Sequence, residues 1–163
     1  FHGHFNMKEL KDLFDIDPDV PVITWLRDPA ERVISNYYYL EKILREKMNH
    51  NQKDLNLLGR MQKTLLEYAS HEANRNRISK FMEGADPADF DFIGLTQHYE
   101  EDLRELAAMM GWSGFTIHQH NITGKKAAVD QESLDTIREL NSRDYEIYKQ
   151  VLRMREERVK NKS

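Results

Sequence analysis

The sequence has no cysteine among its 163 residues, so it can form neither a disulfide nor a thiolate metal site. Proline and glycine are also scarce, with four and seven residues. No apolar run approaches the length of a membrane span, and the longest, residues 20–26, suits a buried strand. Because nothing points to an oxidising compartment, we expect a cytoplasmic protein without a membrane span.

An excess of positive charge is also missing. The chain has 24 Lys and Arg against 28 Asp and Glu, a formal net charge of −4. Nucleic-acid binding needs a broad basic face, so we expect no nucleic-acid partner and only a small, local anion site. Hydrophobic residues make up 39% and charged residues 32%, the balance of a folded protein, and we expect residues 1–163 to form a single domain.

The order of apolar patterns predicts an α/β fold, a small parallel sheet wrapped by many helices. The β-branched run at 20–26 is typical of a central parallel strand. We expect strands at 20–26 and 90–95, and helices at 6–14, 29–47, 55–69, 72–82, 99–110 and 130–159, the last broken around 141–142.

The junction between the first strand and its helix is the most informative stretch. Arg27 closes the strand, Asp28 is a good N-cap, and Pro29 suits the first helical position. A helix N-terminus attracts phosphate, the guanidinium matches phosphate oxygens, and Ser35 lies two turns along the same helix face. Alternatively, Arg27 pairs with Asp28 or Glu31 at the surface and Ser35 only packs.

Residues 27–40, Arg-Asp-Pro-Ala-Glu-Arg-Val-Ile-Ser-Asn-Tyr-Tyr-Tyr-Leu, resemble the 3′-phosphate-binding motif of the PAPS-dependent sulfotransferases. They are most similar to the branch that includes the heparan sulfate and uronyl 2-O-sulfotransferases and bacterial relatives. PAPS is the nucleotide sulfate donor, and PAP is its desulfated product. The resemblance implies a P-loop-NTPase-like sulfotransferase fold, PAPS as co-substrate, and Arg27 and Ser35 as ligands of its 3′-phosphate.

Two further segments resemble functional parts of that family. Residues 1–5, Phe-His-Gly-His-Phe, are similar to the Tyr-His-Gly-His segment, which implies that His4 is the catalytic base with His2 beside it. Gly124, Lys125 and Lys126 resemble the basic loop that closes over the donor nucleotide. Without the resemblance, this Lys pair would read as a solvated turn.

Other segments match the family without carrying a role. Residues 92–96 are similar to the family strand Phe-Ile-Gly-Leu-Thr-Glu, with Gln97 in place of the glutamate. Residues 76–80 resemble Asn-Arg-Gln-Thr-Arg, but Ile78 departs from the pattern, so we assign no catalytic role there. Residues 139–148 match a late helical signature.

The family's lysine-bearing phosphosulfate loop is absent. No Gly-x-x-x-x-Gly-Lys motif occurs, and the Gly-Lys pair at 124–125 lacks the preceding glycine. We therefore expect the chain to be the C-terminal portion of a sulfotransferase domain, without its first strand and P-loop, and to be inactive or weakly active by itself. A missing strand would leave a sheet edge through which a homo-oligomer could form.

The predicted function is in-line transfer of the sulfuryl group of PAPS to an acceptor hydroxyl, on a small molecule or a carbohydrate. The main alternative is a non-catalytic, sulfotransferase-like binding domain, which the absent loop would suit. A small nucleotide-dependent kinase would need a Mg²⁺-binding Asp near a phosphate loop, and the sequence offers no candidate.

Several remaining residues have plain alternative interpretations. His2 and His4 repeat the spacing of His118 and His120, but no carboxylate lies at metal-ligand spacing, so we expect no metal site. His2 and His4 could also be ordinary terminal residues. We expect two of the three tyrosines at 37–39 to pack, and the charge run at 153–158 to be a solvated helix end.

Overall fold

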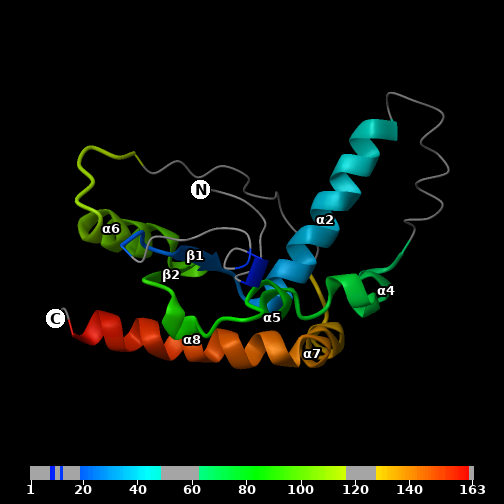
Figure 1. Ribbon diagram of the computed structural model, residues 1–163. Helices are drawn as coiled ribbons and strands as arrows, with labels where there is room; N and C mark the ends of the chain where they lie inside the picture. The colour runs from blue at the N-terminus through cyan, green and yellow to red at the C-terminus, as the bar shows by residue number, and fades with distance from the viewer. Residues whose placement is uncertain (1–7, 10–11, 13–18, 49–62, 117–127, 162–163) are drawn as a thin grey trace. The chain divides into compact units, whose positions relative to one another are not determined.

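The structure is a computed structural model that describes residues 8–9, 12, 19–48, 63–116 and 128–161 (Figure 1). The secondary-structure elements that it describes, with η for a 3-10 helix, are in chain order β1 (Ile23–Leu26), α2 (Pro29–Met48), α4 (Leu65–Ser70), η2 (Glu72–Asn74), α5 (Arg77–Phe81), η3 (Pro87–Asp89), β2 (Phe92–Leu95), η4 (Thr96–His98), α6 (Tyr99–Met109), α7 (Gln131–Leu140) and α8 (Ser142–Lys160). Helices dominate, and the two strands make a small parallel sheet, so the expected α/β class is confirmed.

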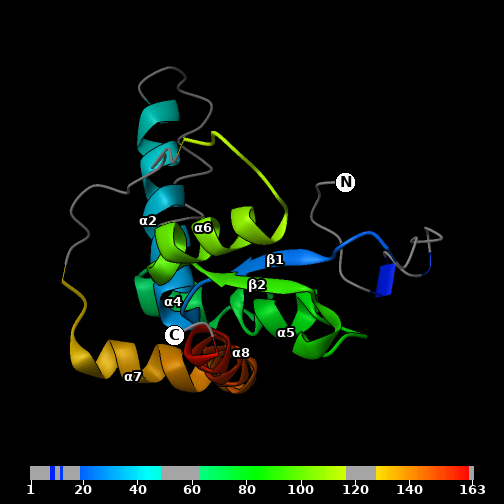
Figure 2. The same cartoon turned by 90° about the vertical axis from the view of Figure 1, so that its left-hand side faces the viewer.

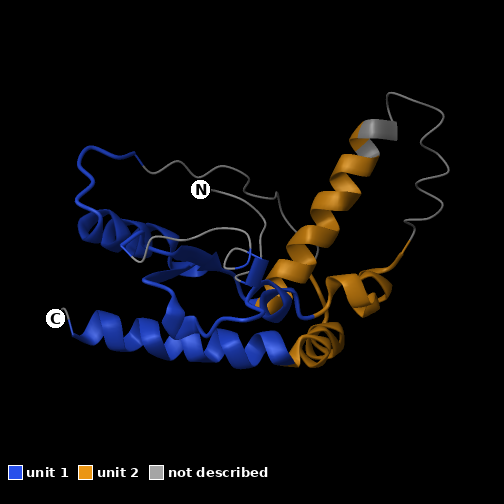
Figure 3. Cartoon of the chain, in the orientation of Figure 1, with its two compact units in different colours: residues 1–28, 76–118, 143–163 blue, residues 29–75, 119–142 orange. Residues whose placement is uncertain are grey.

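The chain divides into two compact units (Figure 3). Unit 1 contains residues 1–28, 76–118 and 143–163, and unit 2 contains residues 29–75 and 119–142. The two units alternate along the sequence, so each is built from segments far apart in the chain. The expectation of a single domain over residues 1–163 stays a prediction.

The sheet of unit 1 consists of β1 and β2, which run parallel and side by side (Figure 1, Figure 2). Ile23 is paired with Phe92 at one end, and Leu26 with Leu95 at the other. Because the strands are parallel and in register, their carboxyl ends lie at the same edge of the sheet. The residues that follow Leu26 and Leu95 are therefore neighbours in space.

The first strand is shorter and less buried than the sequence indicates. It covers only Ile23–Leu26, of which Leu26 alone is buried, whereas all four residues of β2 are buried. Pro21 has no N–H for a ladder. The Val22 N–H bonds to the Asp91 carboxylate at 2.7 Å instead, and Val20 is 55% exposed. The expectation of a strand over 20–26 buried on both faces is therefore wrong at its start.

Gly94 permits the close packing of the two strands. A Cβ at this position would lie 2.4 Å from ring carbons of Trp25, its partner across the ladder. The indole can lie over β2 only because Gly94 has no side chain. Trp25 also packs against Tyr99 and Phe92, with ring centroids 4.9 and 6.2 Å away.

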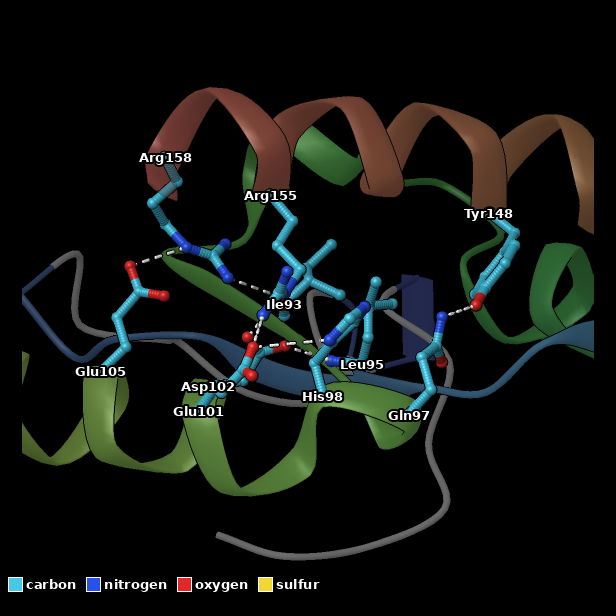
Figure 4. Close-up of polar contacts among 10 residues, drawn as sticks. All are labelled: Ile93, Leu95, Gln97, His98, Glu101, Asp102, Glu105, Tyr148, Arg155 and Arg158. Atoms are coloured by element: carbon cyan, nitrogen blue, oxygen red, sulfur yellow. Dashed lines mark hydrogen bonds and ion pairs between the residues drawn. The ribbon is translucent and has the colours of Figure 1, made fainter. Parts of the chain in front are cut away.

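The edge of β2 that faces away from β1 is covered by charged side chains. The Phe92 N–H donates to the Val22 carbonyl on the β1 side. Because backbone groups alternate in direction along a strand, the N–H and C=O groups of Ile93 and Leu95 point to the opposite edge. There Leu95 N–H donates to the Asp102 carboxylate at 2.8 Å, and Arg158 contacts the Ile93 carbonyl at 3.5 Å (Figure 4). Side chains from α6 and α8 thus take the positions that a third strand would occupy.

The apolar core of unit 1 lies between the sheet, α5 and α8. Leu95 and Val151 are almost completely buried in it, and Tyr145 packs against it. The buried members of this core are Leu26, Ile78, Met82, Phe90, Ile93, Leu95, Tyr148 and Val151.

The expected helix over 72–82 is wrong, because the chain forms η2 and α5 with a break between them. Asn76 has a left-handed backbone with φ 49°, which ends one helix before the next begins. The Asp144 carboxylate, 0% exposed, then accepts hydrogen bonds from the N–H groups of Ile78 and Ser79 at 3.0 and 2.8 Å. This cap comes from 65 residues away, where local sequence gives no sign of it.

Unit 2 is helical in its described part and is built from α2, α4, η2 and α7. The 20-residue α2 matches the helix expected over 29–47 and packs against α4 and α7. Arg32 of α2 donates to the Asn74 carbonyl at 2.9 Å. The buried Asn141 ends α7, and its side-chain amide donates to the Ile137 carbonyl, so the expected break at 141–142 is confirmed.

Among the described residues, no helix combines the length and the apolar character needed to cross a membrane.

Candidate functional site at the carboxyl ends of the parallel strands

Arg27 follows directly after β1 and is exposed. Among the described residues, no hydrogen bond or ion pair involves its guanidinium. An exposed guanidinium at the carboxyl end of a parallel strand can accept an oxyanion without first losing a protein partner. Among the described contacts, Arg27 pairs with neither Asp28 nor Glu31, so the alternative interpretation is not supported.

The Asp28 carboxylate is bound instead by α8. The Tyr145 hydroxyl lies 2.9 Å from Asp28 Oδ1 and 3.0 Å from Oδ2. Tyr145 is half-buried and its ring packs on the unit 1 core, which fixes the position of the phenol. The two neighbours Arg27 and Asp28 therefore differ sharply: the cation is open to solvent, and the anion is tied to a helix.

A second polar contact lies at the same edge, after β2. The Gln97 side-chain amide donates to the Tyr148 hydroxyl (Figure 4). Burial raises the pKa of the Tyr148 phenol above its ordinary value; the Gln97 hydrogen bond opposes this shift and the nearby Asp28 charge adds to it. Tyr148 therefore stays neutral at physiological pH.

Ser35, the second residue expected to bind phosphate, lies in α2 and is only 8% exposed. Arg27 belongs to unit 1 and Ser35 to unit 2. Joint contact of these two side chains with one phosphate stays a prediction, and the small exposed fraction of Ser35 leaves little of it for a ligand.

The other predicted site residues lie outside the described residues. These are His2 and His4, expected to act in catalysis, and Gly124, Lys125 and Lys126, expected to cover the nucleotide. The histidine pair at 118 and 120 lies outside them as well. Within the described part of the chain, no group of three or more His, Asp or Glu side chains could hold a metal ion.

The three tyrosines after Ser35 divide as expected. The Tyr37 hydroxyl donates to the Lys63 carbonyl at 3.0 Å, and its ring contacts those of Tyr38 and Tyr68. Tyr39 is 53% exposed. Two of the three therefore pack within unit 2.

The charge run at 153–158 is not simply a solvated helix end, which corrects the expectation from the sequence. The Arg155 Nε donates to Asp102 Oδ1, and its Nη2 donates to Glu101, both at 2.7 Å. Arg158 pairs with Glu105 at 2.8 Å and lies over the Phe92 ring. These arginines reach from α8 toward α6 past β2 (Figure 4).

The Arg155 pair is the more buried of these contacts. Its side chain is 12% exposed, and Asp102 is 0% exposed. Burial alone lowers the pKa of Arg155, but its hydrogen bonds to Asp102 and Glu101 outweigh burial and raise it. Asp102 also binds the Leu95 N–H, so the pair fixes the end of β2, next to which Gln97 lies.

Sequence reasoning missed Tyr145 and the Asp102–Arg155 pair. Tyr145 and Tyr148 are three apart and so lie on one face of α8, a signal that two phenols approach the same surface. The Asp102–Arg155 pair spans 53 residues and left no comparable sign. Comparisons of the chain with protein-family models, with curated proteins and with solved structures found no match.

Proposed function

We propose that the chain is part of a PAPS-dependent sulfotransferase with a P-loop-NTPase-like sulfotransferase fold. The observation that carries the proposal is the exposed Arg27, which closes β1, has no partner among the described residues, and lies at the edge where the carboxyl ends of both parallel strands meet. This is the edge at which open α/β sheets bind ligands. The motif over residues 27–40 supports a nucleotide 3′-phosphate as that ligand.

In this proposal the acceptor hydroxyl attacks the sulfur of PAPS in line with the departing nucleotide. The new S–O bond forms as the S–O bond to the 5′-phosphate breaks, and PAP leaves with the electron pair. His4 takes the proton of the acceptor hydroxyl, with His2 beside it, because a neutral imidazole is a suitable base near pH 7. The acceptor is a small molecule or a carbohydrate, and the proposed location is the cytoplasm.

The donor would be held mainly through its phosphates. Arg27 and Ser35 bind the 3′-phosphate, and the loop of Gly124, Lys125 and Lys126 covers the nucleotide. No step of this proposal needs a metal ion.

Arg27→Ala tests the anion site. We expect the affinity for PAP to fall toward that for 5′-AMP, which lacks the 3′-phosphate, while the affinity for 5′-AMP stays unchanged. Loss of a charged hydrogen-bond pair of this kind weakens binding by on the order of ten- to a hundredfold. Calorimetric titration of both nucleotides measures the difference.

The matched control is Arg153→Ala, which removes an exposed arginine from α8 and changes the net charge equally. It should bind PAP as the wild type does. Equal PAP affinity in Arg27→Ala and the wild type would refute the assignment of Arg27, and a wild-type protein that prefers 5′-AMP would refute the 3′-phosphate site itself.

His4→Ala tests the base. Removal of a general base slows turnover by about a hundred- to ten-thousandfold, and PAP affinity should not change because the imidazole acts on the acceptor. Because the chain by itself is expected to be inactive or weakly active, turnover is measured in a protein that also carries the lysine-bearing phosphosulfate loop. It is followed as PAP release in the presence of an acceptor, with His71→Ala, an exposed histidine of unit 2, as the control. Wild-type turnover in His4→Ala would exclude this residue from the reaction.

A further inference from the structure

The contact between Tyr145 and Asp28 has no part in the mechanism above, yet it lies beside its central residue. The carboxylate next to Arg27 in sequence is bound through both oxygens by a phenol of α8, at 2.9 and 3.0 Å. Asp28 is half-buried, whereas Arg27 is exposed. The arrangement separates two opposite charges that the sequence places side by side.

A carboxylate competes with phosphate for the same guanidinium. Both present two oxygens that match the fork of an arginine, so the carboxylate of Asp28, the sequence neighbour of Arg27, would compete with an anionic ligand if nothing else held it. A carboxylate that reached Arg27 would also cancel part of the positive potential that attracts the ligand. A donor that holds the Asp28 carboxylate away from Arg27 prevents this competition and reduces the loss of positive potential.

Tyr145 is well placed to be that donor. Its ring packs on the unit 1 core and meets the Tyr148 ring edge-on, with centroids 6.3 Å apart. The phenol is therefore held by apolar packing, and its hydroxyl has a fixed position from which to hold Asp28.

We propose that Tyr145 is a positioning residue of the Arg27 site: its hydroxyl holds the Asp28 carboxylate against α8 and keeps the Arg27 guanidinium open to the phosphate of the ligand. The inference rests on the proposed function, since it concerns the same anion site. It assigns to Tyr145 no contact with the ligand.

The test is a titration of PAP, by calorimetry, into the wild type, Tyr145→Phe, Asp28→Asn and the double variant. Tyr145→Phe should bind PAP about three- to tenfold more weakly, as expected for the loss of one hydrogen bond that restrains a competitor. Asp28→Asn should bind PAP at least as tightly as the wild type, because asparagine has no charge and remains a good N-cap. The double variant should bind like Asp28→Asn, since without the carboxylate the phenol has nothing to restrain.

The rescue by Asp28→Asn separates positioning from a structural role. If Tyr145→Phe and the double variant are equally weakened, the hydroxyl supports the fold rather than the site, and the inference is overturned. Wild-type affinity in Tyr145→Phe overturns it as well. Should Tyr145→Phe not fold, as judged by circular dichroism, Asp28→Asn decides alone: PAP binding weaker than that of the wild type contradicts competition by the carboxylate.

Tyr148→Phe is the matched control, since it removes a phenol from the same helix that bonds to Gln97 and not to Asp28. It should keep wild-type PAP affinity, and a loss equal to that of Tyr145→Phe would count against a specific role for Tyr145. A wild-type protein that binds no PAP would refute the proposed function itself, an outcome distinct from all of these.

Discussion

At the scale of single residues, the sequence identifies the charged side chains well but does not predict which residues they bind. Arg27 was identified from its place after an apolar run, and it lies exposed where the strand ends. For its neighbour Asp28 the sequence indicates an N-cap or an ion-pair partner, and it gives no sign of the hydrogen bond from Tyr145, 117 residues away. The identity of a side chain limits what it can bind, while the fold decides which partner comes within reach.

Gly94 gives the sharpest prediction at this scale. Gly94→Ala places a Cβ 2.4 Å from Trp25 ring carbons, closer than any real contact, so the indole or the strand must shift. Overpacking of this kind costs about 1 to 3 kcal/mol in the free energy of unfolding. Chemical denaturation followed by circular dichroism measures the loss.

The clash can be verified by removing the Trp25 indole, the other group involved. In a Trp25→Leu background the same Gly94→Ala change should cost clearly less, because the indole is no longer there. An equal cost in both backgrounds would locate the problem in the backbone at Gly94 and not in its contact with Trp25.

At the scale of elements, local patterns predicted what local interactions determine. The start of α2 at Pro29 and the break between α7 and α8 follow from residues at those points, and both were expected. The break between η2 and α5 was not, because its cap is the distant Asp144 carboxylate. The strand β1 is shorter than its sequence pattern predicts for a related reason: the Val22 N–H donates a hydrogen bond to the carboxylate of Asp91, which precedes β2.

The ion pairs between α6 and α8 allow a test at this scale, because one arginine binds two carboxylates that differ in burial. Asp102 and Glu101 both bind Arg155 at 2.7 Å, but Asp102 is fully buried and the Glu101 side chain is 69% exposed. Asp102→Asn should cost about 3 kcal/mol, because its amide cannot accept from both Leu95 N–H and Arg155. Glu101→Gln should cost less than about 1 kcal/mol, since water screens an exposed pair.

Urea denaturation of both variants measures the two costs. Similar losses in stability would show that burial does not distinguish the two carboxylates, and the interpretation of Asp102 as the anchor of β2 would fail.

At the scale of the whole molecule, the sequence predicted class and order but not assembly. The α/β class and the parallel pairing of two strands were expected from alternating strand and helix patterns. The division into two units that alternate along the chain was not, because the contacts that define a unit join segments such as 1–28 and 143–163. The charge run at 153–158 illustrates the same limit. On its own it is typical of a solvent-facing helix, and only the position of α6 and β2 gives two of its arginines, which are partly buried, their ion-pair partners.

The charged cover on β2 also bears on how the protein avoids aggregation. A bare strand edge is a template onto which another chain can add its own backbone. Here an added strand that pairs with Ile93 and Leu95 would have to displace Arg158 and Asp102 first, and the buried Asp102 carboxylate would lose the hydrogen bond from the Leu95 N–H. Uncontrolled growth of the sheet is therefore penalised on that side, by the same residues that anchor its second strand.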